Sequence, residues 1–402
     1  MKNLLFSTTL LTAMAMPALA QNDTVSTEHR PNEHTLACLE APTRDCAFTS
    51  ALQTVIGEEF GIERAKVLIG VARAMIETGQ KDQAIQTLML ALDEARSVRL
   101  TLVTQEKITV IAPLLARAGD DAGALALSEE LQNDGIRDAV LAKIAEEAIA
   151  EGQLADARVA LGQMSNRVKA FWRELSLLPR APRQALATVD LAGLDELVHG
   201  LDVPDQRYQG IVQLAILADR MGRPGDRNAY LAEADELFSS IVGIASRATI
   251  TAQRARSMFD AGMDDAFVRE SYELAMLHGG RLRNNMALVD FAKKIGVIEA
   301  ASGDLETALS RLEYFVAVDE KAQYLASLRA GSNLSIFAAE MRELLNEVEE
   351  LQGAYERDLV RLTLLEGALG NSDMYLARHV VEAMEDDDNQ ALALALMAPL
   401  LE

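Results

Sequence analysis

Aromatic side chains are scarce in this 402-residue chain, and long β-branched runs are missing. Phe, Trp and Tyr together make up 4% of the sequence, and only one residue is tryptophan. Half of the residues are hydrophobic, and Ala and Leu dominate among them. Small and unbranched side chains favour closely packed helices over sheets. The composition therefore predicts an all-α protein.

Basic residues are also in short supply. Lys and Arg number 38 against 61 Asp and Glu, which gives a formal net charge of −23. A nucleic-acid-binding face must be basic, because it has to neutralise phosphates. The same shortage disfavours anionic lipid headgroups as partners. We interpret most of the acid excess as charge that keeps the protein in solution, and expect no nucleic-acid partner.

Cysteine is nearly absent, with Cys38 and Cys46 as the whole complement. In an oxidising compartment a lone close pair is most simply a disulfide, and Pro42 between them lets the chain fold back. Closing a loop of about nine residues gives a chain-entropy stabilisation of about 2.5 kcal/mol. A metal site that also uses His29 and His34 stays open as the alternative, although the spacing matches no familiar zinc pattern.

The one long apolar stretch without charge lies at the start of the chain. Lys2 precedes it, residues 4–16 form it, and Ala18 and Ala20 give a small-x-small end. This order is typical of a secretory signal peptide over residues 1–20. The stretch is shorter than the roughly 20 residues that span a bilayer. We expect a protein of the bacterial periplasm, or as second choice of the medium, with no membrane span after cleavage.

A short pattern recurs along most of the chain. A helical run ends at Gly, four residues follow, and a small residue opens another amphipathic run. Because glycine readily adopts the left-handed conformation that ends a helix, each copy predicts a helix–turn–helix hairpin. Such repetition predicts an α-solenoid, in which each unit buries its apolar face by stacking on the next. Clear copies begin at Gly79, Gly119, Gly152 and Gly303, and looser ones at Gly222, Gly262 and Gly370, with Gly331 as a weak turn between the last two units.

The first clear unit covers residues 62–97. Both of its predicted helices carry one apolar stripe at helical spacing. The first stripe is Ala65, Leu68, Ile69, Ala72, Met75 and Ile76, and the second is Ala84, Ile85, Leu88, Ala91, Leu92 and Ala95.

This unit resembles a tetratricopeptide repeat. Ala72 holds the small position of the family's helix A, and the turn and helix B positions match at Gly79, Ala84, Leu88, Ala91 and Leu92. Similar matches surround two other turns, with Ala145, Ala157 and Leu161 near Gly152, and Gly296, Ala308 and Leu312 near Gly303. The resemblance implies a right-handed superhelix of stacked antiparallel hairpins. The turn glycines from 79 to 152 and from 222 to 303 step by 40, 33, 40 and 41 residues, whereas the family's period is 34.

These patterns divide the chain. Residues 21–42 read as a flexible N-terminal segment, and residues 43–402 as the solenoid, with 386–402 as a C-terminal capping helix laid against the last repeat. The stretch 180–205 is rich in proline and glycine. It predicts either a bend between two lobes or an irregular repeat within one superhelix.

The acidic run 385–388 lies just before the last predicted helix. A calcium loop that starts at Asp386 would need glycine at its sixth position and glutamate at its twelfth, where Ala391 and Met397 stand. We interpret the run as a loop that ends one helix and caps the next, since acids before a helix interact favourably with its dipole.

In tetratricopeptide repeats, helix A lines most of the concave side. The resemblance therefore implies a partner groove, several of whose residues are basic and suit a carboxylate or an acidic peptide. The alternative is a set of solvated helix faces with local ion pairs of little energetic weight. The implied groove residues are Lys66, Ile69, Arg73, Ile76, Arg256, Phe259, Asp290 and Lys293.

Enzyme signatures are absent from the sequence. We find no zinc-protease His-Glu-x-x-His, no nucleophile elbow, no phosphate-binding loop and no dinucleotide fingerprint. We therefore expect no catalysis, cofactor or metal, and predict a scaffold that binds a protein or peptide in the bacterial cell envelope. Two alternatives stay open: an enzyme or accessory subunit acting on the cell wall or an exported polymer, and a small-ligand or metal-binding module.

Overall fold

The computed structural model describes residues 33–57 and 60–401 of the chain. Within these residues the secondary structure consists of 21 α-helices and four short 3-10 segments, without a strand. The all-α fold class predicted from composition is thereby confirmed. The signal-peptide prediction for residues 1–20 lies outside the described residues.

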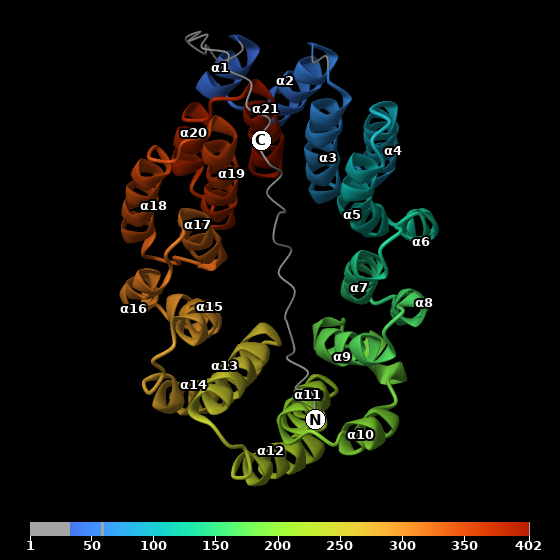
Figure 1. Cartoon of the computed structure of the whole chain (residues 1–402), viewed down its shortest axis with the longest axis vertical. Coiled ribbons are helices and arrows are strands. Elements are labelled where there is room, and N and C mark those ends of the chain that lie inside the picture. Colours follow the sequence, from blue (N-terminus) through green and yellow to red (C-terminus); the bar gives the residue numbers. More distant parts are fainter. Residues whose placement is uncertain (1–32, 58–59, 402) are drawn as a thin grey trace. The chain divides into compact units, whose positions relative to one another are not determined.

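The helices alternate in two series, which build antiparallel hairpins (Figure 1). The first helices of the hairpins are α3 (Gly61–Glu77), α5 (Thr101–Ala118), α7 (Asp134–Ala150), α9 (Arg167–Leu177), α11 (Pro204–Arg220), α13 (Ile244–Asp260), α15 (Asn285–Ala301), α17 (Val318–Ser327), α19 (Ala354–Gly370) and α21 (Asp387–Met397). The second helices are α4 (Lys81–Ser97), α6 (Asp121–Glu129), α8 (Leu154–Gln163), α10 (Leu191–His199), α12 (Pro224–Phe238), α14 (Asp265–Gly279), α16 (Leu305–Ser310), α18 (Leu334–Val348) and α20 (Met374–Glu382).

Two helices precede this series, and four 3-10 segments interrupt or follow it. They are α1 (Glu33–Glu40), α2 (Arg44–Gly57), η1 (Leu178–Arg180), η2 (Ala185–Thr188), η3 (Arg311–Tyr314) and η4 (Ala398–Leu400).

Each hairpin stacks on its neighbours. Helix α3 packs on α4 and on α5, and α5 packs in turn on α6 and α7. The first helices begin at residues that lie between 33 and 41 positions apart. The structure therefore confirms a helical repeat solenoid, while the variable unit length does not single out the tetratricopeptide family with its period of 34.

Most turns between the two helices of a hairpin follow one geometry. At Gly79 the backbone φ is 81°, its amide donates to Ile76 at 3.0 Å, and the next amide donates to Met75 at 2.8 Å. This pair of bonds is the Schellman motif, which ends a helix at a left-handed residue. Six other glycines that the pattern selected also have positive φ: Gly119, Gly152, Gly222, Gly262, Gly303 and Gly331.

Gly370 is the exception among the predicted turns. It is the last residue of α19, and the left-handed position falls two residues later, on Ser372 with a φ of 55°. The amide of Asp373 closes that turn by donating to Ala368 at 3.0 Å. The turn was expected at Gly370 because glycine readily adopts the left-handed conformation, but here Ser372 adopts it.

The loops between hairpins share a hydrogen bond from an arginine side chain to a loop carbonyl. Arg207 donates to the carbonyl of Leu201 at 2.6 Å, and Arg247 donates to that of Ile241 at 2.8 Å. In both cases the arginine lies near the start of the first helix of a hairpin. Its acceptor is the carbonyl six residues earlier, in the loop that leads from the preceding hairpin. An arginine at this offset thus satisfies a carbonyl that the end of the preceding helix leaves without a helical partner.

The sequence predicts a flexible segment over residues 21–42, of which 21–32 lie outside the described residues. In the described part, Glu33–Glu40 forms α1. The reason is packing: Cys38 and Leu39 are buried, with exposed fractions of 0% and 2%. A disulfide joins Cys38 to Cys46 on α2, with the two Cα atoms 5.7 Å apart. Neither cysteine is therefore a free thiolate for the metal site that the sequence left open.

The stretch 180–205 holds η2, α10 and the loops around them instead of a regular hairpin. The described residues all belong to one compact unit. Whether this stretch acts as a bend stays a prediction.

The last helix, α21, packs on α19 and α20, as a helix that closes the last repeat would. It also packs on α2 and α3, from the other end of the described chain (Figure 1). The solenoid therefore closes on itself, which the interpretation of 386–402 as a capping helix against the last repeat did not foresee.

Candidate binding sites

Two of the four groove residues predicted on α3 contact the C-terminal part of the chain. Lys66 donates to the side chain of Asn389, and Arg73 pairs with Glu366 at 2.8 Å. Ile69 is half-buried against the core, and Ile76 is buried. The two basic groove residues of α3, Lys66 and Arg73, are thus already engaged by polar groups of the same chain.

The other four predicted residues form a second group on α13 and α15. Arg256 pairs with Asp260 at 2.8 Å and donates to the carbonyl of Lys293 at 3.5 Å. Asp290 forms an ion pair with Lys294, and Phe259 is half-buried against the core.

Lys293 also has an aromatic partner, because its ammonium lies 5.7 Å from the centre of the Phe315 ring. Two separate groups therefore replace one continuous basic lining, and their charges have partners within the chain. That they bind a partner stays a prediction.

A pocket of about 310 Å³ lies beside the second group, between η3, α17 and α18. Leu312, Phe315, Leu325 and Leu344 provide its apolar lining, and all four side chains are buried. Its polar lining comes from Glu313, Lys321, Glu340, Glu343 and Glu347.

The polar lining of this pocket, which we call the acidic pocket, is strongly negative. Four glutamates and one lysine give a net charge of −3. Lys321 pairs with Glu347 at 2.7 Å, whereas Glu313, Glu340 and Glu343 have no ion pair within the described part of the chain. Burial, and then the charges of Glu343 and Glu347, raise the pKa of the Glu340 carboxyl. A cation placed here would relieve the repulsion among these carboxylates.

The acidic pocket was not predicted from the sequence, although the sequence contains a signal for it. Glu340, Glu343 and Glu347 follow one another at helical spacing and therefore share one face of α18. What the spacing could not reveal is that η3 and α17 lie opposite this face and make it concave.

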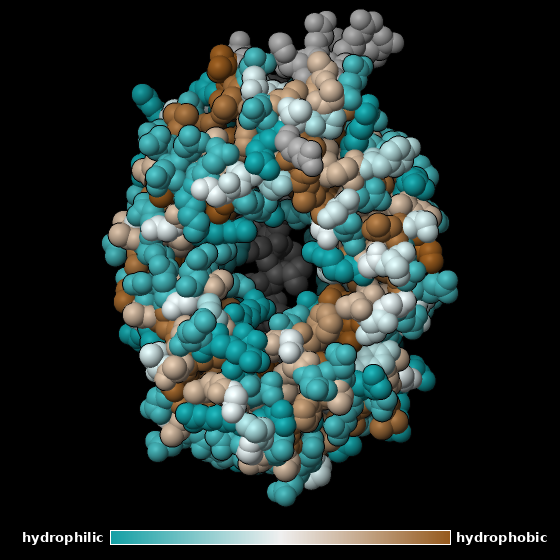
Figure 2. Space-filling model, turned by 180° about the vertical axis from the view of Figure 1, so that it is seen from behind, coloured by the Kyte–Doolittle hydropathy of each residue, from teal (hydrophilic) through white to brown (hydrophobic). Residues whose placement is uncertain are grey.

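Most of the face drawn in Figure 2 is hydrophilic, and its hydrophobic residues are scattered without forming one large continuous patch. Scattered apolar residues are normal on a protein surface and do not by themselves indicate a docking site. Val316, next to the acidic pocket, is one of the most exposed apolar residues, at 84%.

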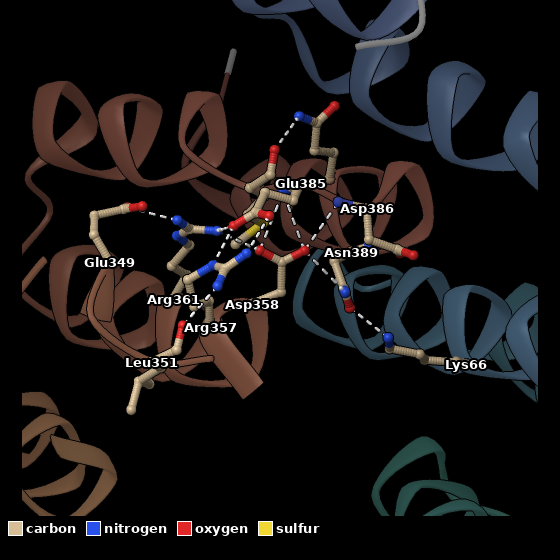
Figure 3. A network of polar contacts seen from close by, with 11 residues as sticks. Lys66, Glu349, Leu351, Arg357, Asp358, Arg361, Glu385, Asp386 and Asn389 are labelled. Carbon is tan, nitrogen blue, oxygen red and sulfur yellow. Dashed lines mark hydrogen bonds and ion pairs between the residues drawn. The ribbon is translucent and has the colours of Figure 1, made fainter. Parts of the chain in front are cut away.

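A second polar constellation joins α19 to the start of α21 (Figure 3). Asp358 is fully buried, with an exposed fraction of 0%, and pairs with Arg361, which is 1% exposed, at 2.8 Å. The same carboxylate accepts hydrogen bonds from the amides of Glu385 at 3.1 Å and Asp386 at 3.0 Å. We call this group, together with Arg357, the joint network.

Asp386 begins the last helix. Its side chain accepts a hydrogen bond from the amide of Asn389 at 2.9 Å, which makes it the N-cap of α21. The interpretation of the acidic run 385–388 as a capping loop is thereby confirmed. In the joint network this loop is held by buried side chains of α19.

Glu385 supplies the acid sensitivity of the joint network. Hydrogen bonds from Arg357, at 2.6 Å to one carboxylate oxygen, and from Arg361 lower the pKa of Glu385 from 4.5 to about 2. A lowered folded-state pKa contributes stability above the unfolded-state value, and this contribution is lost as the pH falls through the folded-state value.

We therefore expect the urea midpoint of the protein to fall between pH 4.5 and pH 2, and to fall less in Glu385→Gln, which has no carboxylate to protonate. Glu382→Gln, on an exposed ion pair with Arg378, is the matched control and should follow the unmodified chain. Parallel pH profiles for all three proteins would contradict the expectation.

Other chemistry is less prominent in the described residues. They contain no group of three or more His, Cys, Asp or Glu side chains arranged to hold a metal ion. None of their helices is both long enough and apolar enough to cross a membrane.

The chain was compared with protein families, curated proteins and solved structures. No family model and no curated protein matches the chain. Among solved structures, the chain is similar to one described as a circular tandem repeat protein with novel repeat topology and enhanced subunit contact surfaces. The identity is 15%, the match covers 91% of this chain and 86% of that one, and the TM-score is 0.20.

Proposed function

We propose that this protein is a non-catalytic repeat scaffold of the bacterial periplasm, and that it binds a basic segment of a partner protein in the acidic pocket. The observation that carries the proposal is a concave site in which buried leucines and Phe315 lie beneath glutamates without ion-pair partners. In helical repeat folds each unit contacts only the units next to it. The stack therefore leaves extended surfaces that partners can bind. The Cys38–Cys46 disulfide is compatible with an exported protein.

A lysine or arginine side chain suits both parts of the acidic pocket. Its aliphatic stem can cover apolar surface while its charged head meets carboxylates. Hydrogen bonds between a cationic donor and a carboxylate are about twice as strong as neutral ones. The basic groove residues predicted from the sequence are already paired within the chain, so the acidic pocket has the larger unmatched charge.

Peptide binding tests this proposal directly. We expect a fluorescein-labelled peptide of lysines spaced by glycines to bind, and Glu343→Lys to weaken binding about tenfold, which corresponds to about 1.4 kcal/mol. The measurement is fluorescence anisotropy at low and high salt, because the attraction should be screened by salt. A matching peptide with glutamates in place of lysines should not bind.

Glu236→Lys is the control for this experiment. It makes the same charge change on an exposed residue of α12 that is outside the acidic pocket. An equal loss of binding in both variants would show a general effect of net charge, and would overturn the pocket as the site. Capture from crosslinked envelope extract, compared between the unmodified chain and Glu343→Lys, would then identify the natural partner.

The non-catalytic part of the proposal has its own test. A peptidoglycan zymogram of the purified protein should show no cleared zone. Clearing that survives further purification would favour the alternative of an enzyme acting on the cell wall.

A further inference from the structure

Helix α21 stands in the place of a first helix but lacks a second helix of its own. It follows α19 in the series of first helices and packs on α19 and α20. Within the described residues, only η4 comes after it. The second helix that covers it is α2, which packs on both α21 and α3, much as α4 packs on both α3 and α5.

The contact between α21 and the N-terminal helices is an apolar core. Ala391 and Ala395 of α21 cluster with Ala51 of α2 and with Val67 and Val71 of α3, and all five side chains are fully buried. At Gly70 of α3 the two helices approach closely, because an ideal Cβ there would overlap the Cδ1 atom of Leu392.

Hydrogen bonds also join α2 and α3 to the C-terminal part of the described chain. Arg44 at the start of α2 donates to the carbonyls of Ala398 at 3.4 Å and Leu401 at 3.1 Å. Lys66 of α3 donates to Asn389 of α21, and Figure 3 shows that contact beside the joint network. The carbonyls at the end of α21 and η4 thus receive donors from the opposite end of the described chain.

We propose that α21 and α2 form one repeat unit split between the two ends of the solenoid, and that this split unit is the point at which the closed array opens. Every other first helix is joined to its second helix by at most 13 residues, so the second helix stays close after local separation. The split unit has no such connection. Its two helices are more than 300 residues apart in sequence, and closing them costs more chain entropy than closing a hairpin.

This arrangement makes opening local. In a repeat array each unit contacts mainly its neighbours, so separating one interface leaves the others in place. Opening exposes the apolar faces of α2 and α3 on one side, while the joint network keeps the start of α21 on α19. The disulfide between Cys38 and Cys46 fastens α1 to α2, and Cys38 belongs to the same buried cluster as Leu394 and Met397 of α21. It therefore restrains the N-terminal half of the split unit.

Hydrogen exchange followed by mass spectrometry tests the proposal on the full chain. In the unmodified protein, with urea below the unfolding transition, α2 and α21 should lose protection together and at least tenfold faster than α5, α7, α11 and α13. Exchange of α21 at the same rate as these internal helices would overturn local opening.

A pair of substitutions tests the joint itself. Gly70→Ala should accelerate exchange in α2 and α21 and leave the internal hairpins unchanged, because the new methyl group overlaps the Cδ1 atom of Leu392 and makes that side chain move. Adding Leu392→Ala to this variant removes the overlapping atoms and should restore part of the protection. Gly225→Ala, whose Cβ would meet nothing within 4 Å, is the control and should change neither region.

Three outcomes of the substitution experiment would overturn the proposal. In the first, Gly70→Ala leaves α21 as protected as before. In the second, exchange accelerates equally in all hairpins, which would mean that the array unfolds as one body. In the third, Leu392→Ala restores no protection, which would mean that the effect does not arise at this contact.

Discussion

Asp358→Ala should destabilise the protein by about 3–5 kcal/mol, the usual cost of removing one partner of a buried ion pair. Asp358 and Arg361 are both almost completely buried, so the substitution leaves a cation with less compensation in the interior. The amides of Glu385 and Asp386 lose their acceptor at the same time. Urea denaturation followed by circular dichroism measures the loss, and Asp358→Asn, which keeps shape but removes charge, should be less severe.

The control for Asp358→Ala is an ion pair of the same kind at the surface. Arg378 and Glu382 lie 2.7 Å apart, and both side chains are 42% exposed. Exposed pairs contribute about 0.2–1 kcal/mol, so Glu382→Ala should cost no more than this. Similar losses for the two substitutions would show that burial of the joint network does not determine its contribution.

Gly296→Ala should destabilise the protein by about 1–3 kcal/mol, the usual cost of adding a methylene-sized group to a well-packed core. An ideal Cβ at Gly296 of α15 would overlap the hydroxyl oxygen of Tyr324 and lie 2.8 Å from its Cζ atom. The ring cannot move away cheaply. It stacks on Phe315 with centroids 4.8 Å apart, and its hydroxyl donates to the carbonyl of Ala308 at 2.7 Å.

Thermal and urea unfolding of Gly296→Ala check this expectation against Gly162→Ala. Gly162 lies in α8 with nothing within 4 Å of an added Cβ. Alanine should therefore stabilise that helix by about 0.5–1 kcal/mol, because glycine carries the larger entropy cost in a helix. The expectation about Gly296 fails if both alanine variants are equally stable.

At Gly296 the sequence predicted the small residue but not the contact that requires it. The resemblance to tetratricopeptide repeats placed a small residue of helix A at this position, and the structure gives the physical reason, which is the close approach of Tyr324. The resemblance did not identify Tyr324, because nothing near it in sequence marks it as the partner of Gly296.

The acidic pocket illustrates the same division. Three of its glutamates lie at helical spacing on one segment, so their common face follows from the sequence. The apolar lining around Leu312 and Phe315 comes from a different unit, and only its stacking on α18 makes a pocket. For the groove residues the limit was of another kind: the sequence located Lys66 and Arg73 on one helix, but their partners Asn389 and Glu366 come from distant parts of the chain.

Local patterns in this chain were sufficient for the helices, for most hairpin turns and for the cap of the last helix. Each of these depends on residues within one or two turns of each other, as at Gly79 and Asp386. The closure of α21 on α2 and α3 was decided by tertiary structure. It depends on the rotation from each unit to the next, summed over the whole array, and these small rotations arise from packing between units rather than from any local pattern.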